Sequence, residues 1–218
     1  MIEATLLISS KNYSSWSLRG FLLAKLSGID FTEEHVSPDD KRAREELLMR
    51  TSSILVPCLI HDGVSVWDTL AIAEYLNERF PEAQMLPKEK MARARCRSIA
   101  GEMHSGFAAL RSSLPMNLRF HKPGFTVWSS AQADIDRVTA IWRECLNTWK
   151  GPFLFGKQPT IADAMYAPVV TRFLSYDVAV GPVCQDYCDT IMNWAPMKEW
   201  IAGAHEEPQE IIELDLDF

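Results

Sequence analysis

Hydrophobic positions recur at two different spacings over the first eighty residues. Short apolar runs between polar neighbours, such as 4–9 (ATLLIS), indicate buried strands, whereas the apolar positions of 16–28 recur at helical spacing. A His-Asp-Gly segment joins two further apolar runs, which favours a hairpin. The predicted strands are 4–9, 31–36, 56–60 and 64–68, and the predicted helices are 16–28, 39–50 and 69–80.

This βαβαββα order predicts an α/β domain over 1–80, in which helices cover the faces of a four-stranded mixed sheet. Segment 81–87 contains two prolines and is interpreted as a linker. Only helical patterns follow, so we expect an all-α helical bundle domain over 88–218. Its predicted helices are 88–114, 126–150, 160–176, 184–194 and 196–205.

Composition and charge narrow the class of protein. Hydrophobic residues make up 47% of the 218 positions and charged residues 23%, which is typical of a globular protein with a substantial core. The net charge of −7 disfavours nucleic acid and anionic membrane surfaces as partners. The N-terminus has no basic region before its apolar run, and no apolar run is long enough to span a membrane. We therefore expect a cytoplasmic protein.

The five cysteines are odd in number and scattered, which favours reduced thiols over a disulfide framework. Cys184 and Cys188 stand four positions apart, and this spacing matches no common zinc pattern. We expect no metal site.

The pair Val56-Pro57 opens a predicted strand. A proline cannot donate to the sheet ladder, so it belongs at an edge or a bend, where a cis peptide bond occurs most readily. The backbone groups of Val56 would then be free to pair with an extended peptide ligand. An ordinary strand-initiating proline is the alternative interpretation.

Asp68 and Thr69 lie where a predicted strand ends and a predicted helix begins. Both residue types are common helix caps, and capping alone accounts for them. The same position suits an anion, because a ligand carboxylate can accept bonds from the Thr69 hydroxyl and the free helix N–H groups. With Asp68 beside a ligand ammonium, the pair would hold an amino-acid zwitterion.

Ser14 and Ser15 lie at the start of the first predicted helix, and one of them is expected to cap it. No motif supplies the base that a serine nucleophile needs. A hydroxyl at a helix N-terminus can instead donate a hydrogen bond to a thiolate, with help from the helix dipole. Together with Val56 and Asp68-Thr69, this describes a site for a small cysteine peptide with a free γ-glutamyl end.

Four segments resemble the cytosolic glutathione transferase superfamily, in the same order along the chain. SSWSLRG (14–20) is similar to the S-S-C-x-x-R-V segment of the serine-type zeta class, and Ser14 has the placement of the catalytic serine of the zeta and tau classes. VPCL (56–59) resembles the cis-proline strand, and WDTLAIAEYL (67–76) resembles the E-S-x-A-I-x-x-Y-L segment. TIADAMYAP (160–168) resembles the S-x-A-D capping box.

The resemblance implies a thioredoxin-like N-terminal domain, an all-helical C-terminal domain, a homodimer, and glutathione as co-substrate. It implies that glutathione is conjugated to a small electrophile, with Ser14 or Ser15 as the catalytic hydroxyl. The implied site residues fall into two further groups. The glutathione contacts are Leu55, Val56, Pro57, Asp68 and Thr69, and the substrate pocket is Trp16, Met103, His104 and Phe107.

The chain departs from the family pattern at two of these positions. Leu55 stands where a basic residue contacts the glycyl carboxylate, and Trp16 stands where the zeta class has cysteine. Arg42, Arg44 and Arg50 are candidates to replace the missing cation. Two alternatives stay open at this point: a glutathione-dependent isomerase of the maleylacetoacetate type, and a non-catalytic binding protein with the same fold.

Overall fold

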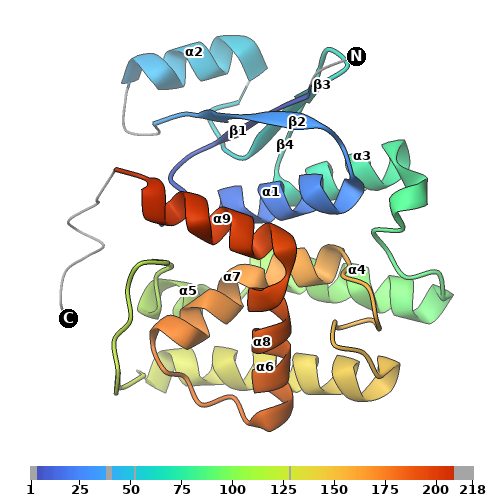
Figure 1. Cartoon of the computed structure of the whole chain (residues 1–218), viewed down its shortest axis with the longest axis vertical. Coiled ribbons are helices and arrows are strands. Elements are labelled where there is room, and N and C mark those ends of the chain that lie inside the picture. Colours follow the sequence, from blue (N-terminus) through green and yellow to red (C-terminus); the bar gives the residue numbers. More distant parts are fainter. Residues whose placement is uncertain (1–3, 38–40, 52, 128, 209–218) are drawn as a thin grey trace.

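The computed structural model describes residues 4–37, 41–51, 53–127 and 129–208. A four-stranded mixed sheet forms one end of the molecule (Figure 1), as the sequence predicts. Its strands are β1 (Ala4–Ile8), β2 (Phe31–His35), β3 (Cys58–His61) and β4 (Val64–Trp67), in the spatial order β2-β1-β3-β4. Strand β1 is parallel to β2 and antiparallel to β3, and β3 is antiparallel to β4.

Helices cover both faces of this sheet. α2 (Lys41–Thr51) lies on the outer face, while α1 (Ser15–Ser27) and α3 (Thr69–Arg79) lie on the face turned toward the rest of the molecule (Figure 1). Alternate residues of β1 therefore enter different cores: Leu6 and Ile8 join the main core, and Leu7 packs with the small cluster under α2.

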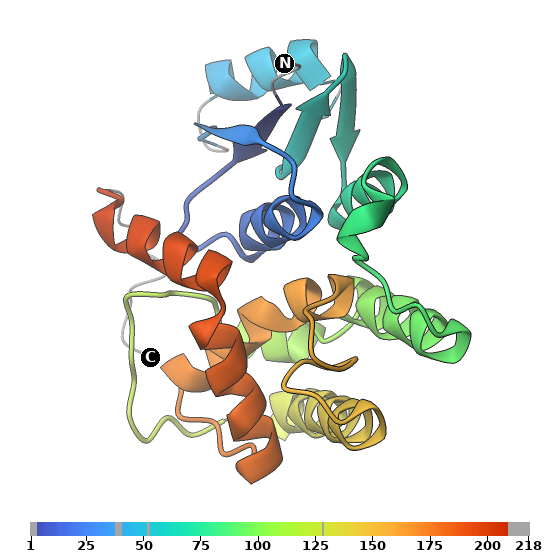
Figure 2. The same ribbon diagram turned by 45° about the vertical axis from the view of Figure 1, so that its right-hand side comes forward.

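The second half of the chain is helical (Figure 2), which confirms the predicted fold class. α7 is buried along nearly its whole length and packs against α1, α4 and α8, so it is hydrophobic on all sides rather than amphipathic. A short 3-10 turn, Pro81–Ala83, precedes these helices. The helices are α4 (Lys90–Ser105), α5 (Ala108–Ser113), α6 (Ser129–Trp149), α7 (Ile161–Ser175), α8 (Pro182–Asn193) and α9 (Ala195–Glu206).

The single helix predicted over 88–114 is wrong, because the chain breaks between α4 and α5. The Gly106 N–H caps α4 by donating to the Glu102 carbonyl oxygen at 2.9 Å, and Phe107 then takes a left-handed conformation with φ +58°. A Cβ at Gly106 would lie 2.7 Å from that same oxygen, so glycine permits the break. The division into domains at 1–80, 81–87 and 88–218 stays a prediction.

The capping box predicted at Thr160 is confirmed. The Asp163 carboxylate accepts bonds from the backbone N–H of Thr160 at 2.7 Å and from its hydroxyl at 2.8 Å. It also accepts bonds from the Leu154 N–H and the Tyr187 hydroxyl. Asp163 is fully buried, and this burial raises the pKa of its carboxyl. One side chain therefore joins α7, α8 and the loop before α7.

No helix within the described ranges is long and apolar enough to cross a membrane. The expectation of a cytoplasmic location stays a prediction.

Replacing Asp163 by alanine leaves four buried donors without an acceptor, so we expect the free energy of unfolding to fall by about 3 kcal/mol. Urea denaturation followed by circular dichroism measures this change. The matched control is Asp189→Ala, because within the described residues the Asp189 carboxylate accepts a hydrogen bond only from the exposed Gln185 side chain on α8. The control should change the free energy by less than about 0.5 kcal/mol. Equal shifts in the two variants would contradict the role of Asp163.

Candidate functional site

A cavity of about 230 Å³ opens where the start of α1, the approach to β3, the start of α3 and the end of α4 meet. Every residue that lines it was singled out by the sequence analysis. The lining residues are Trp16, Leu55, Val56, Pro57, Asp68, Thr69 and His104.

The Val56-Pro57 peptide bond is cis and directly precedes β3. Pro57 packs so closely on α1 that a Cβ at Gly20 would lie 2.6 Å from the Pro57 Cβ. Glycine in a helix interior costs about 1 kcal/mol relative to alanine, and here the close approach of Pro57 explains it. Within the described residues, the backbone N–H and C=O of Val56 form no hydrogen bond. They are available to a ligand, as the sequence analysis expected.

Asp68 caps α3 from a backbone conformation that non-glycine residues rarely adopt, with φ +73°. Its Oδ1 accepts a bond from the Leu70 N–H at 2.8 Å, and its Oδ2 lies 3.0 Å from Nε2 of His104. The Thr69 hydroxyl lies 3.4 Å from Nδ1 of the same imidazole. Backbone strain of this kind costs on the order of 1–3 kcal/mol, and it concentrates at functional sites.

The contact between His104 and Asp68 is one that sequence reasoning missed. The two residues are 36 positions apart, and no local pattern pairs them; the pairing arises because the end of α4 packs beside the start of α3. His104 also contacts Trp16 edge-on, with ring centroids 5.2 Å apart. The histidine thus connects both walls of the cavity.

Ser14 and Ser15 are not among the lining residues. Ser14 caps α1: its Oγ accepts a bond from the Ser17 N–H at 3.2 Å and donates to the Ser17 Oγ at 2.9 Å. Ser17 Oγ in turn accepts a bond from the Ser9 N–H at 3.0 Å. Ser15 is buried in the first turn of α1. The capping role is therefore confirmed for Ser14, and a thiolate contact for either serine stays a prediction.

Met103 and Phe107 are buried in the main core and do not line the cavity. Met103 lies one residue before His104 on α4, so the helical repeat turns its side chain away from the cavity. A role for these two residues in holding substrate stays a prediction.

Among the residues that the structure describes, no arginine lines the cavity at its Leu55 end. Leu55 is 59% exposed, and none of Arg42, Arg44 and Arg50 lines the cavity. Arg50 instead forms a bidentate pair with Glu34 on β2. The three candidate replacements for the missing cation are therefore not assembled at the site.

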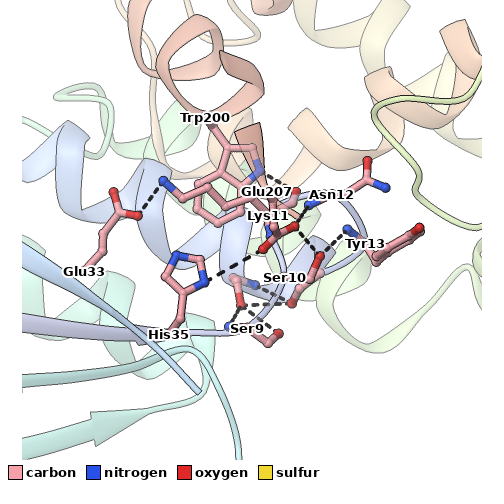
Figure 3. Close-up of polar contacts among 11 residues, drawn as sticks. Ser9, Ser10, Lys11, Asn12, Tyr13, Glu33, His35, Trp200 and Glu207 are labelled. Carbon is pink, nitrogen blue, oxygen red and sulfur yellow. Dashed lines mark hydrogen bonds and ion pairs between the residues drawn. The ribbon is translucent and has the colours of Figure 1, made fainter. Parts of the chain in front are cut away.

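The loop that leads into Ser14 is held from both sides, and Figure 3 shows the side on which Glu207 lies. The Glu207 carboxylate, just after α9, accepts bonds from the Ser10 hydroxyl at 2.7 Å and from the N–H groups of Lys11 at 2.9 Å and Asn12 at 3.1 Å. On the other side, Asn12 Oδ1 accepts a bond from the Leu118 N–H at 2.8 Å. We call the contacts of Glu207 with residues 10–12 the clasp. Sequence reasoning did not find the clasp, because Glu207 is nearly two hundred residues away from its partners.

No cysteine of the chain is suited to act as a thiolate. All five are buried. Burial raises the pKa of Cys58 to about 11 and that of Cys96, Cys145 and Cys188 to about 12, and it raises the pKa of Cys184 as well. At neutral pH these thiols are protonated and weakly nucleophilic. A reactive sulfur at this site must come from a ligand.

Comparison with known proteins supports the assignment of the family. Family models described as "Glutathione S-transferase, N-terminal domain" and "Glutathione S-transferase, C-terminal domain" match residues 13–79 and 90–203. "Probable maleylacetoacetate isomerase" of Caenorhabditis elegans is 27% identical over 77% of this chain and 78% of that protein. "Glutathione S-transferase 1" of Dianthus caryophyllus is 26% identical over 85% and 86%, respectively.

Solved structures show the same fold. A glutathione transferase homolog from Burkholderia with bound glutathione gives a TM-score of 0.72 at 22% identity, covering 94% of this chain and 100% of that one. Maleylacetoacetate isomerase from Anaeromyxobacter dehalogenans with bound glutathione gives 0.67 at 24% identity, covering 95% and 98%.

Gly20→Ala should destabilise the protein despite the better helix propensity of alanine. The added methyl group must displace Pro57, and overpacking of this kind costs about 1–3 kcal/mol, which exceeds the propensity gain. Urea denaturation measures the change. Gly101→Ala is the matched control, since it also lies in a helix but has open space around the new Cβ. We expect Gly20→Ala to be destabilised and Gly101→Ala to be neutral or stabilised. Stabilisation of both variants would show that Pro57 shifts easily.

Glu207→Gln should loosen the loop before Ser14. Glutamine replaces one carboxylate oxygen by an NH₂ donor, which cannot accept a hydrogen bond from the facing N–H groups. We therefore expect the free energy of local opening of this loop to fall by about 1–3 kcal/mol. Amide hydrogen exchange of residues 10–14 should become faster, as measured by mass spectrometry. Glu206→Gln is the control, because Glu206 is an exposed neighbour. Unchanged exchange in Glu207→Gln would contradict the clasp.

Proposed function

The chain belongs to the glutathione S-transferase family, and from this premise we propose that its cavity binds glutathione and delivers the sulfur to a small electrophile. The observation that carries the proposal is the convergence, in one cavity, of the Val56 backbone, the start of α3 and Trp16 on α1. Each feature meets a different part of a cysteine peptide. The chain is a transferase enzyme by family, so the proposal concerns which groups perform the transfer.

The γ-glutamyl end of glutathione is assigned to Asp68 and Thr69. Its carboxylate would accept bonds from the Thr69 hydroxyl and from the N-terminus of α3, and its ammonium would meet the Asp68 carboxylate. His104 already contacts both side chains, with Nε2 3.0 Å from Asp68 and Nδ1 3.4 Å from Thr69. It acts here as a positioning residue, since it holds both groups at the cavity wall.

The cysteinyl backbone is assigned to Val56, whose N–H and C=O would pair with it as with an added strand. The glycyl end would lie toward Leu55. Leu55 offers no charge, so this end would be held by backbone and apolar contacts rather than by an ion pair.

The sulfur is assigned to the start of α1. Ser14 donates its one proton to Ser17 Oγ at 2.9 Å. A thiolate is a stronger acceptor than a hydroxyl, so the Ser14 proton would turn to the ligand while Ser14 Oγ continues to accept from the Ser17 N–H. This bond and the α1 dipole favour the thiolate and lower the thiol pKa from its usual value of about 8.5.

Transfer then needs only a positioned thiolate. The sulfur attacks an electrophilic carbon, a C–S bond forms, and the leaving group departs with its electron pair or, in an addition, the displaced pair takes up a proton. Holding both reactants together supplies much of the rate enhancement. Trp16 and His104 line the side of the cavity from which the electrophile would approach.

An isomerase that regenerates glutathione is the second candidate, because several relatives carry that name, including "Maleylacetoacetate isomerase" of Rattus norvegicus, which is 27% identical over 77% of this chain. Incubation with maleylacetoacetate and glutathione separates the two functions. An isomerase returns the glutathione unconsumed, whereas a transferase consumes one equivalent for each electrophile. A homodimer and a cytoplasmic location belong to the same proposal and are tested by sedimentation and by cell fractionation.

Ser14→Ala should lose most of its turnover but retain glutathione binding, because the lost bond acts on the thiolate. Removal of one preorganised donor to a developing or bound anion costs about 10²–10³ in kcat. The thiolate absorbance of bound glutathione, followed by pH titration, should show a raised thiol pKa. The missing cap should also lower the free energy of unfolding by about 1 kcal/mol.

Ser15→Ala is the matched control for this variant, and it should retain turnover and thiol pKa. If Ser15→Ala loses the activity instead, the roles of the two serines are exchanged. If neither variant loses turnover, the assignment of a serine is wrong.

A further inference from the structure

Three arginines that the proposed mechanism does not use lie together behind Trp16. They are Arg19 on α1, Arg111 on α5 and Arg172 on α7. Burial lowers the pKa of Arg19 well below its ordinary value and that of Arg172 to about 10, and the neighbouring guanidinium groups of the cluster lower both further. Within the described residues, none of the three takes part in an ion pair.

The two buried members are held by neutral groups only. Arg19 donates to the carbonyl oxygens of Met165 at 2.8 Å and Ser15 at 3.3 Å, and Arg172 donates to the carbonyl oxygen of Arg111 at 3.0 Å. The Nε of Arg172 is buried without a hydrogen-bond partner. Carbonyl groups solvate a cation but do not neutralise it, so no group among the described residues compensates the positive charge of the cluster.

Arg111 differs from the other two because it is only half-buried and its guanidinium forms no hydrogen bond within the described part of the chain. Arg172 holds the backbone of Arg111 in place by donating to the Arg111 carbonyl oxygen. All five N–H donors of the Arg111 side chain are therefore unused by the described residues, in a fork that matches a planar carboxylate.

Trp16 connects this cluster to the cavity. The guanidinium carbons of Arg111 and Arg19 lie 4.8 Å and 4.7 Å from the indole ring centroid, which are cation–π distances. The same indole lines the cavity and contacts His104. The cavity is thus acidic at Asp68 and is bordered beyond Trp16 by positive charge that no described residue compensates.

We propose that Arg111, stacked on Trp16, binds a carboxylate carried by the electrophile. This inference rests on the proposed function and narrows its substrate class from small electrophiles to those that bear an anionic group next to the reacting carbon. Arg19 and Arg172 act behind Arg111 as fixed charges that favour the anion. A carboxylate at this end could also come from the glycine of glutathione, and the experiment separates the two sources.

Two matched conjugates test the proposal without requiring turnover. S-carboxymethylglutathione and S-carbamoylmethylglutathione differ only in a carboxylate against a neutral amide beside the sulfur. Calorimetry should show that the wild-type protein prefers the carboxylate, and that this preference falls about tenfold or more in Arg111→Gln. Arg111→Lys should restore part of it, since it keeps the charge but not the fork. Arg143→Gln, on the exposed surface of α6, removes the same charge elsewhere and should leave the preference unchanged.

Turnover gives a second readout with a chloronitrobenzoate and the corresponding benzamide. In both, the sulfur forms a bond to the ring carbon and chloride leaves with the bonding pair. The ratio of the two kcat/KM values should fall in Arg111→Gln while the KM for glutathione stays the same. Circular dichroism and the thermal midpoint verify that each variant is folded.

Equal preference in wild type and Arg111→Gln would overturn the inference while leaving the transferase intact. If Arg111→Gln binds both conjugates more weakly by the same factor and has a raised KM for glutathione, Arg111 binds the glycine carboxylate of glutathione. This result would also overturn the inference. Failure of the wild-type protein to bind either conjugate would overturn the proposed function itself, and the inference with it.

Discussion

The close packing of α1 against Pro57 is the constraint on which the site depends. α1 lies between the sheet and the helical half, packing against β1 and α3 on one side and α7 and α9 on the other. Gly20 allows the helix to approach Pro57, and this approach sets the distance between the first turn of α1 and the strand that follows Pro57. A cavity of about 230 Å³ between them is lined from both sides. The site is therefore a property of how four parts of the chain pack, and no single loop forms it.

A second constraint acts on the same helix from outside the cavity. The clasp of Glu207 on residues 10–12, together with the bond that Asn12 accepts from the segment after α5, fixes the chain immediately before Ser14. Trp200 adds a bond from its Nε1 to the Lys11 carbonyl oxygen at 2.9 Å. The start of α1 is thus preorganised by residues from the far end of the chain. Preorganised donors act on a bound anion without paying for reorganisation during the reaction.

The sequence was sufficient for those parts of the structure that local rules determine. Strand alternation, helix periodicity and caps predicted the four-stranded mixed sheet, the helical second half and the capping box at Thr160, and a resemblance of four segments indicated the family. The break at Gly106 was missed, because the apolar spacing continues on both sides of it and a single glycine is tolerated within helices.

The candidate site likewise contains residues that local rules predict and contacts that they do not predict. Residues at element boundaries, such as Pro57 and Asp68, could be predicted because their types match the backbone roles of an edge and a cap. The contacts of His104 with Asp68, of Glu207 with Lys11 and of Arg111 with Trp16 could not be predicted, since they join segments from different elements. Such contacts depend on helix rotation and packing, and neither has a local signature.

The distribution of charge around the cavity follows from these tertiary contacts. With a net charge of −7, the chain has ample carboxylates to neutralise three clustered arginines, and it pairs many of its other arginines in this way. Arg19 and Arg172 are instead bound to carbonyl oxygens inside the core. Buried charge without a counterion is unfavourable, so an arrangement of this kind is most stable when an anion completes it. At the opposite wall the Asp68 carboxylate is partly exposed, and one of its oxygens has only His104 for a partner within the described residues. The two walls are thus suited to opposite charges of the bound reactants, and this asymmetry would orient them before any bond is formed.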